Sequence, residues 1–281
     1  MSVIINGNQI SQDIRNQVKS EVLVLKEQKG IVPGLAVILV GEDPASRIYV
    51  KRKENACKEV GFISREYILP QDTPESQLIG IIDELNHDNR IHGILVQLPL
   101  PGHLNATAII ESIDPIKDVD GFHPWNMGRL ITGNPYHVAC TPRGIVEMID
   151  RCKIDISGKE AVIVGRSNIV GKPLALLLLN RHATITICHT RTSHLAEVTK
   201  RADILIAAAG RPEMIKGNMV KDGAVVIDVG INRMDDGHLV GDVAFAEVTD
   251  RASYITPVPG GVGPMTIAML LMNTLQAAAR F

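Results

Sequence analysis

Three side chains of types that general acid–base chemistry uses, and one amide that could orient them, form a candidate set. Tyr49 and Lys53 lie four residues apart in the amphipathic stretch 46–61, so a helix there places both on one face. Gln97 interrupts an apolar run, where an unpaired amide costs about 1–3 kcal/mol, so it needs a partner. Asp120 follows in the segment KDVDG. Together they make one candidate chemical site.

The tyrosine, the lysine and the aspartates can also be explained without a function. Tyr-x-x-x-Lys is also the catalytic pair of short-chain dehydrogenases. In those enzymes the pair follows the glycine motif, whereas in this chain it comes before the glycine turn, so that assignment is rejected. On a helix, such a pair is more often at the surface, with the lysine reaching water. Asp118 and Asp120 equally suit a plain turn, because Asp and Gly are common turn residues. The last two alternatives remain open.

Metal and serine-hydrolase chemistry are not indicated. The nine histidines form no HExxH or other i, i+4 pair, and GxSxG does not occur. The four cysteines are scattered without a CxxC pair, so reduced thiols are expected rather than disulfides or a zinc cluster. They are Cys57, Cys140, Cys152 and Cys188.

A glycine turn runs from Gly165 to Gly171, between an apolar run and an apolar helix. Such a turn lets backbone amides approach a pyrophosphate. It departs from G-x-G-x-x-G because Ser167 replaces the middle glycine and the last gap is one residue longer. A P-loop is excluded, since five residues separate the glycines and Pro173 follows Lys172. A tight turn without a ligand remains the alternative.

The expected cofactor is NADP. NAD sites usually carry an acidic residue about 20 residues past the glycines, where it binds the ribose 2′-hydroxyl. The corresponding stretch 188–192 has no carboxylate and contains Thr190, while Arg166 sits in the turn. A hydroxyl and a guanidinium suit a 2′-phosphate.

Two series of apolar runs and amphipathic stretches position these residues. Their β–α order predicts parallel sheets with helical crossovers, the second sheet being doubly wound. The first series comprises strands 35–40 and 92–101 and helices 8–29, 46–61 and 75–87; the second comprises strands 161–165, 184–189, 202–210 and 224–230. The Gly- and Pro-rich stretch 117–142 separates them. The final apolar helix, 264–281, is predicted to pack back on the first domain.

Length and charge fit a cytoplasmic two-domain protein that acts on a small molecule. The 281 residues suit two domains of roughly 150 residues. The net charge of −2 shows no excess of positive charge that would favour binding to nucleic acid or to an anionic membrane. The N-terminus lacks the pattern of a secretory signal, and no apolar run approaches the roughly 18 residues that span a bilayer.

Five segments together resemble the bifunctional methylenetetrahydrofolate dehydrogenase/cyclohydrolase family. They are YVKRK (49–53), VQLPLP (96–101), KDVDGF (117–122), VGRSNIVGKP (164–173) and PVPGGVGPMT (257–266). Their order and spacing follow the family over essentially the whole chain. The resemblance implies an N-terminal αβα folate-binding catalytic domain, 1–120 plus 264–281, and a C-terminal Rossmann-type NADP-binding domain, 121–263. The active site would lie in a cleft between them, in a homodimer.

The resemblance also implies residue roles. Lys53 would be the catalytic lysine, Tyr49 would stack on the folate, Gln97 would orient Lys53, and Asp120 would hold the pterin. The cofactor site would comprise Gly165, Arg166, Ser167, Gly171, Thr190 and Ile231. The substrate would also meet Gly260, Gly261, Pro264 and Thr266.

The chemistry adds one expectation about Lys53. The methenyl intermediate is a cation, so a protonated lysine would repel it. Desolvation should lower the pKa of the amine, which could then accept a proton during water attack. Two other functions are weighed: another two-domain oxidoreductase acting on an amino acid or a shikimate-like substrate, and a non-catalytic NADP-sensing protein.

Overall fold

The chain forms two compact units in the computed structural model, which describes residues 2–281. The N-terminal unit comprises Gln12–Cys140 and Ile267–Phe281, and the C-terminal unit comprises the residues through Ser11 and Thr141–Thr266. The α/β class and the parallel sheets expected from the sequence are confirmed.

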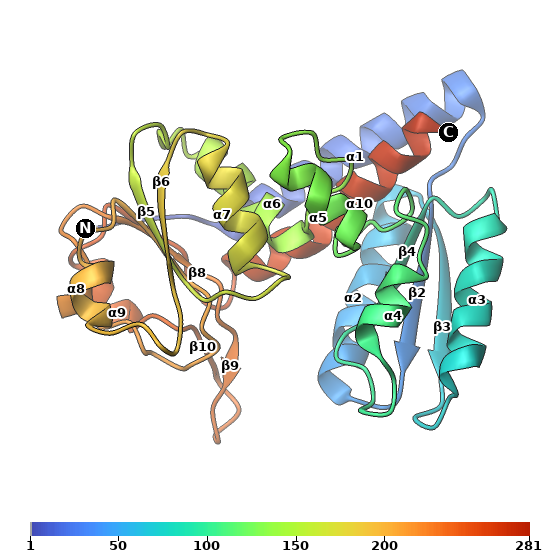
Figure 1. Ribbon diagram of the computed structural model, residues 1–281. Helices are drawn as coiled ribbons and strands as arrows, with labels where there is room; N and C mark the ends of the chain where they lie inside the picture. The colour runs from blue at the N-terminus through green and yellow to red at the C-terminus, as the bar shows by residue number, and fades with distance from the viewer. Residues whose placement is uncertain (1) are drawn as a thin grey trace. The chain divides into compact units, whose positions relative to one another are not determined.

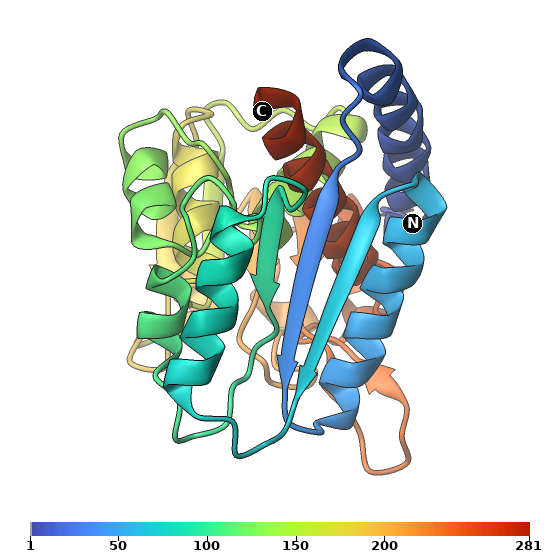
Figure 2. The same ribbon diagram turned by 90° about the vertical axis from the view of Figure 1, so that its right-hand side faces the viewer.

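A three-stranded parallel sheet forms the centre of the N-terminal unit, in the order β3-β2-β4. Ala36, Ile38 and Val40 of the central strand pack against α3 and α4. Helix α2 packs beside β2 and β3 on the other side of the sheet, as Figure 2 shows. The elements are α1 (Gly7–Lys29), β2 (Gly34–Val40), α2 (Pro44–Val60), β3 (Ile63–Leu69), α3 (Glu75–His87), β4 (Gly93–Val96), α4 (Ala106–Glu111) and α5 (Pro124–Ile131).

Helix α2 is defined at both ends by its own sequence. The Asp43 carboxylate accepts a hydrogen bond from the Ser46 amide at 2.7 Å, and proline occupies the first helical position. Gly61 ends the helix in the left-handed conformation, at φ 83°. These limits place Lys53 on the buried face of the helix, with Val50 and Cys57.

The KDVDG segment is anchored to the N-terminal unit by its first two polar residues. The ammonium of Lys117 donates to the carbonyls of Leu85, Asn86 and Asp88 at the end of α3, at 2.7 to 3.0 Å. The carboxylate of Asp118 accepts from backbone amides of the following turn. The backbone just before Asp120 is therefore held by side-chain hydrogen bonds on both of these residues.

Helix α10 (Val262–Arg280) holds the other side of this loop. Asn273 donates to the carbonyls of Val119 and Val138 at 2.7 and 3.0 Å. The expectation that no segment is long and apolar enough to span a membrane was wrong for this helix, whose length and apolar composition would both allow it. About two thirds of it (67%) is buried within the protein, as in a core helix.

The C-terminal unit contains a six-stranded parallel sheet in the order β1-β11-β8-β7-β5-β6. Its strands β5, β6 and β8 are labelled in Figure 1. From β5 onward the sheet has the doubly wound order 2-1-3-4-5, whose direction of winding reverses between β5 and β7. Its elements are β1 (Val3–Ile4), α6 (Cys140–Arg151), β5 (Glu160–Val164), α7 (Gly171–Leu179), β6 (Thr184–Cys188), α8 (Leu195–Thr199), β7 (Ile204–Ala207), η1 (Gly217–Met219), β8 (Val225–Asp228), β9 (Asn232–Arg233), β10 (Leu239–Val240), α9 (Phe245–Thr249) and β11 (Tyr254–Ile255).

The two units divide the chain differently from the expected boundaries at 120 and 264. Residues 121–140 belong with the N-terminal unit, where the carbonyl of Val138 is held by α10. Residues 2–11 belong with the C-terminal unit because β1 pairs with β11. Pairing between distant segments decides both differences.

Replacing Lys117 with methionine should lower the free energy of unfolding by about 3 kcal/mol, because three buried carbonyls lose a charged donor. Urea unfolding followed by circular dichroism measures the change. The matched control is Lys58→Met, since Lys58 is exposed and pairs only with Glu54 at the surface. A shift no larger than that of the control would show that the Lys117 contacts contribute nothing measurable.

Candidate active site and dinucleotide site

The amine of Lys53 is buried and held by one amide. Its side chain is 7% exposed, and Nζ donates to Oε1 of Gln97 at 2.9 Å. The surface-lysine alternative therefore does not hold. Burial lowers the pKa of Lys53, while the negative charge of Asp120 opposes that shift. The amine is thus poised closer to neutrality than a lysine in water.

Gln97 is fixed by both its backbone and its side chain. It follows β4, and its amide N–H donates to the carbonyl of Ile38 at 2.8 Å. The side-chain Nε2 donates to the carbonyl of Leu98 at 2.7 Å, which directs Oε1 toward Lys53. The sequence required a partner for this amide, and the structure supplies two.

Asp120 is the acidic partner of the lysine. Burial raises the pKa of its carboxyl to about 6, against the effect of Lys53, which lowers it. The thiol of Cys140, which donates to the carbonyl of Val119 at 3.3 Å, also lowers the pKa of Asp120. Asp118, by contrast, is 2% exposed and occupied by its own turn and by Asn126. The turn explanation thus suits Asp118.

The remaining residue of the predicted set, Tyr49, lies one helical turn before Lys53 and is half-buried. Cys140 is the neighbour that sequence reasoning missed, because nothing in the local pattern VACTP pairs it with a residue twenty positions earlier.

The glycine turn follows β5 and packs against the loop after β7. Gly165 has φ 137°, and a Cβ there would come within 2.2 Å of the carbonyl oxygen of Ala208. A Cβ on Gly171 would come equally close, 2.2 Å, to the carbonyl oxygen of Gly165. The Ser167 hydroxyl accepts from the amide of Val170 at 3.1 Å. Both glycines are required by close backbone contacts.

A cavity of about 280 Å³ opens beside this turn, at the carboxyl ends of β5, β6 and β7. This is the switch point of the sheet, where doubly wound folds bind their ligands. Its lining contains no carboxylate and includes predicted and unpredicted residues. The lining comprises Val164, Gly165, Arg166, Ser167, His189, Thr190, Leu195, Ala208, Ala209, Arg211 and Met214. These residues fit a phosphorylated dinucleotide.

Two predicted cofactor residues lie outside this lining. Gly171 is buried at the start of α7, behind the turn. Ile231 follows β8 and lies near Gly263, where an added Cβ would be 3.4 Å from it. Arg211, which sequence reasoning missed, reaches the cavity from the loop after β7.

The PGGVGPMT segment lies in the C-terminal unit and is closely packed. Gly260 has φ 101°, and its carbonyl accepts from the Asn8 amide at 3.2 Å. A Cβ on Gly7 would lie 1.8 Å from the carbonyl oxygen of Gly261. Thr266 hydrogen-bonds Thr141 through the two hydroxyls at 2.9 Å, and Pro264 lies in the first turn of α10.

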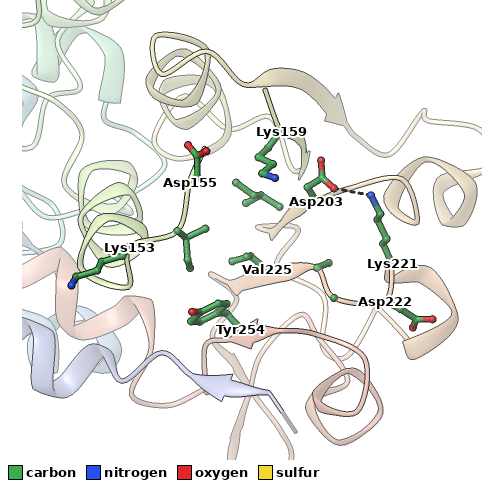
Figure 3. Close-up of a pocket in the computed structure, with 12 residues that line it drawn as sticks. Lys153, Asp155, Lys159, Asp203, Lys221, Asp222, Val225 and Tyr254 are labelled. Carbon is green, nitrogen blue, oxygen red and sulfur yellow. Dashed lines mark hydrogen bonds and ion pairs between the residues drawn. The ribbon is translucent and has the colours of Figure 1, made fainter. Parts of the chain in front are cut away.

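A slightly larger hollow, of about 310 Å³, lies at the opposite edge of the same sheet (Figure 3). It opens at the amino ends of β5, β7, β8 and β11. Its charges include Lys221, which pairs with Asp203 at 2.7 Å, and Asp222, which pairs with Arg251 at 2.9 Å. Lacking the glycine turn, this edge is not the dinucleotide site. Among residues 2–281, no group of His, Cys, Asp and Glu is suited to hold a metal ion.

Comparison with known families accounts for both units. Residues 5–120 match the catalytic domain of tetrahydrofolate dehydrogenase/cyclohydrolase, and residues 139–281 match its NAD(P)-binding domain. The bifunctional protein FolD 2 of Geobacter metallireducens is 58% identical over 280 residues, covering 100% of this chain and 98% of that protein.

Solved structures give the same result. The bifunctional FolD enzyme of Campylobacter jejuni has a TM-score of 0.98 and 49% identity, over 100% of this chain and 99% of that one. The Trypanosoma brucei enzyme, solved with NADP and an inhibitor, has a TM-score of 0.95 and 39% identity, over 99% and 98%. These matches do not favour the alternative of an oxidoreductase acting on an amino acid or a shikimate-like substrate. The chain belongs to the tetrahydrofolate dehydrogenase/cyclohydrolase family.

Proposed function

We propose that Lys53, Gln97, Asp120 and Tyr49 form the folate site of a bifunctional dehydrogenase and cyclohydrolase. The enzyme oxidises 5,10-methylenetetrahydrofolate to the 5,10-methenyl cation and then adds water to give 10-formyltetrahydrofolate and a proton. The observation that carries this assignment is the buried Lys53 amine, 2.9 Å from Gln97 Oε1 and under the influence of Asp120.

Lys53 serves the hydrolytic reaction as a proton acceptor. Water attacks the methenyl carbon, and the neutral amine takes up the proton that the water loses. A neutral amine also avoids repelling the cationic substrate, and burial lowers the pKa of Lys53 in that direction. Gln97 holds the amine in place, the ring of Tyr49 stacks on the folate, and Asp120 binds the pterin.

NADP is the proposed cofactor, and when bound it accepts a hydride from the methylene carbon. Gly165, Ser167 and Gly171 shape the turn for the pyrophosphate, and Arg166 and Thr190 bind the 2′-phosphate. Ile231 would contact the cofactor from beyond β8. By the family resemblance, Gly260, Gly261, Pro264 and Thr266 would also contact the folate.

Lys53→Met should reduce hydrolysis of 5,10-methenyltetrahydrofolate by about 10²–10⁴-fold, the usual contribution of a positioned acid–base group. NADP binding should persist, because Lys53 lies outside the unit that carries the glycine turn. The decay of methenyl absorbance measures the hydrolysis. Lys51→Met, an exposed neighbour on α2, is the control. Normal hydrolysis by the Lys53 variant would refute the role.

Arg166→Ala should weaken NADP binding by about tenfold or more and NAD binding by much less, because only NADP carries the 2′-phosphate that the guanidinium binds. Binding titrations with NADP and with NAD give the two affinities that are compared. Arg201→Ala, an exposed arginine of the same unit, controls for general loss of positive charge. Equal losses for NADP and NAD would mean that Arg166 does not bind that phosphate.

The proposed partners are the folate, NADP and a second copy of the chain, and the proposed location is the cytoplasm. All four cysteines are free, which suits a reducing compartment. For the homodimer, β3 is the relevant element. It is the edge strand of its sheet, and Ile63 and Ile68 are 40% and 57% exposed. An open edge with apolar side chains favours pairing with another chain.

Ile68→Lys should convert the dimer to a monomer, because an edge lysine opposes strand pairing. Light scattering after size-exclusion chromatography gives the mass. Ile131→Lys places the same charge on the exposed helix α5 and should leave the dimer intact. A wild-type monomer, or a dimer unaffected by the Ile68 change, would contradict the proposal.

A further inference from the structure

Two buried aspartates lie together at the carboxyl edge of the C-terminal sheet, outside every motif considered above. Asp228 ends β8 and is 3% exposed, and Asp242 follows β10 and is 0% exposed. Buried carboxylates are costly unless they are hydrogen-bonded, so their partners explain their presence.

Asp242 is bound by three consecutive backbone amides. Its Oδ2 accepts from Ala209 and Gly210 at 2.6 and 2.9 Å, and its Oδ1 accepts from Arg211 at 2.9 Å. The side-chain amide of Asn232 donates to the same Oδ1 at 3.0 Å. Successive amides pointing at one anion are a strong and directional binding arrangement. Here the anion belongs to the chain itself.

Asp228 in turn fixes the backbone that carries Asp242. Its Oδ1 accepts from the amides of Asp242 and Gly230 at 2.9 and 3.0 Å, and its Oδ2 accepts from Val243 at 2.9 Å. A Cβ on Gly241 would lie 1.8 Å from Asp228 Oδ2. The two carboxylates and the surrounding backbone therefore form one closely packed cluster.

The loop that Asp242 holds is a wall of the dinucleotide cavity. Ala208, Ala209 and Arg211 all line that cavity. The carbonyl of Ala208 faces Gly165 so closely that an added Cβ would be 2.2 Å from it. A shift of this loop would change the wall opposite the glycine turn and would move the Arg211 guanidinium.

We propose that Asp242 is a positioning residue of the NADP site, whose carboxylate holds residues 208–211 against the glycine turn and presents Arg211 to the cofactor. Asp242 touches neither cofactor nor substrate and acts through the loop. The inference rests on the proposed NADP site and assigns part of its geometry to a residue remote in sequence.

Asp242→Asn preserves the size of the side chain but replaces an acceptor oxygen with an NH₂ group that cannot receive the loop amides. The expected result is NADPH binding weakened about tenfold or more in a fluorescence titration. Hydrolysis of 5,10-methenyltetrahydrofolate, measured without nicotinamide, should stay within about twofold, because that reaction needs no dinucleotide. Asp222→Asn, an exposed carboxylate of the same unit, should change neither quantity.

Asn232→Ala keeps the test decisive if Asp242→Asn does not fold, since it removes only one of the four donors. It should weaken NADPH binding by about two- to fivefold. Unchanged binding in a folded Asp242→Asn or Asn232→Ala protein would overturn the proposal, as would parallel loss of hydrolysis. If the wild type binds NADPH but turns over no folate, the proposed reactions fail while the test of Asp242 still stands.

Discussion

A buried amine constrains the rest of the N-terminal unit. An ammonium removed from water must find partners or lose its proton. The Lys53 amine does some of each. Gln97 accepts a hydrogen bond from it and the charge of Asp120 favours the protonated form, whereas burial favours the neutral form. The site is thus a coupled acid–base pair rather than a single lysine, and its two pKa values depend on each other.

The surrounding structure is explained by the need to keep that pair in place. Lys117 donates to backbone carbonyls, and Asp118 accepts from backbone amides and from Asn126. Asp120 is the carboxylate of this segment whose charge acts on the Lys53 amine. Asn273 of α10 closes the same loop from the other side. Neighbouring residues of one short segment thus differ: Lys117 and Asp118 bind the backbone, and Asp120 acts electrostatically on Lys53.

Buried carboxylates also hold the backbone in place in the C-terminal unit. Asp228 and Asp242 collect backbone amides that have no partner within the strands, at the edge where the dinucleotide cavity opens. The opposite edge has a hollow of similar size, in which Lys221 pairs with Asp203, but it has no glycine turn. Volume alone does not identify the site, whereas strand polarity and the glycine turn do.

The sequence by itself determined the α/β class, the glycine turn, the family resemblance and the residue types of the catalytic set, because these follow from local periodicity and spacing. It missed strand β3, whose segment ISREYIL mixes charged and apolar residues at a half-exposed edge. The tertiary structure alone decided that Lys53 is buried, that Asp118 is held by its own turn and by Asn126, and that Asp242 binds the loop after β7. The first and the last of those facts depend on contacts between residues distant in the chain, which no local pattern encodes.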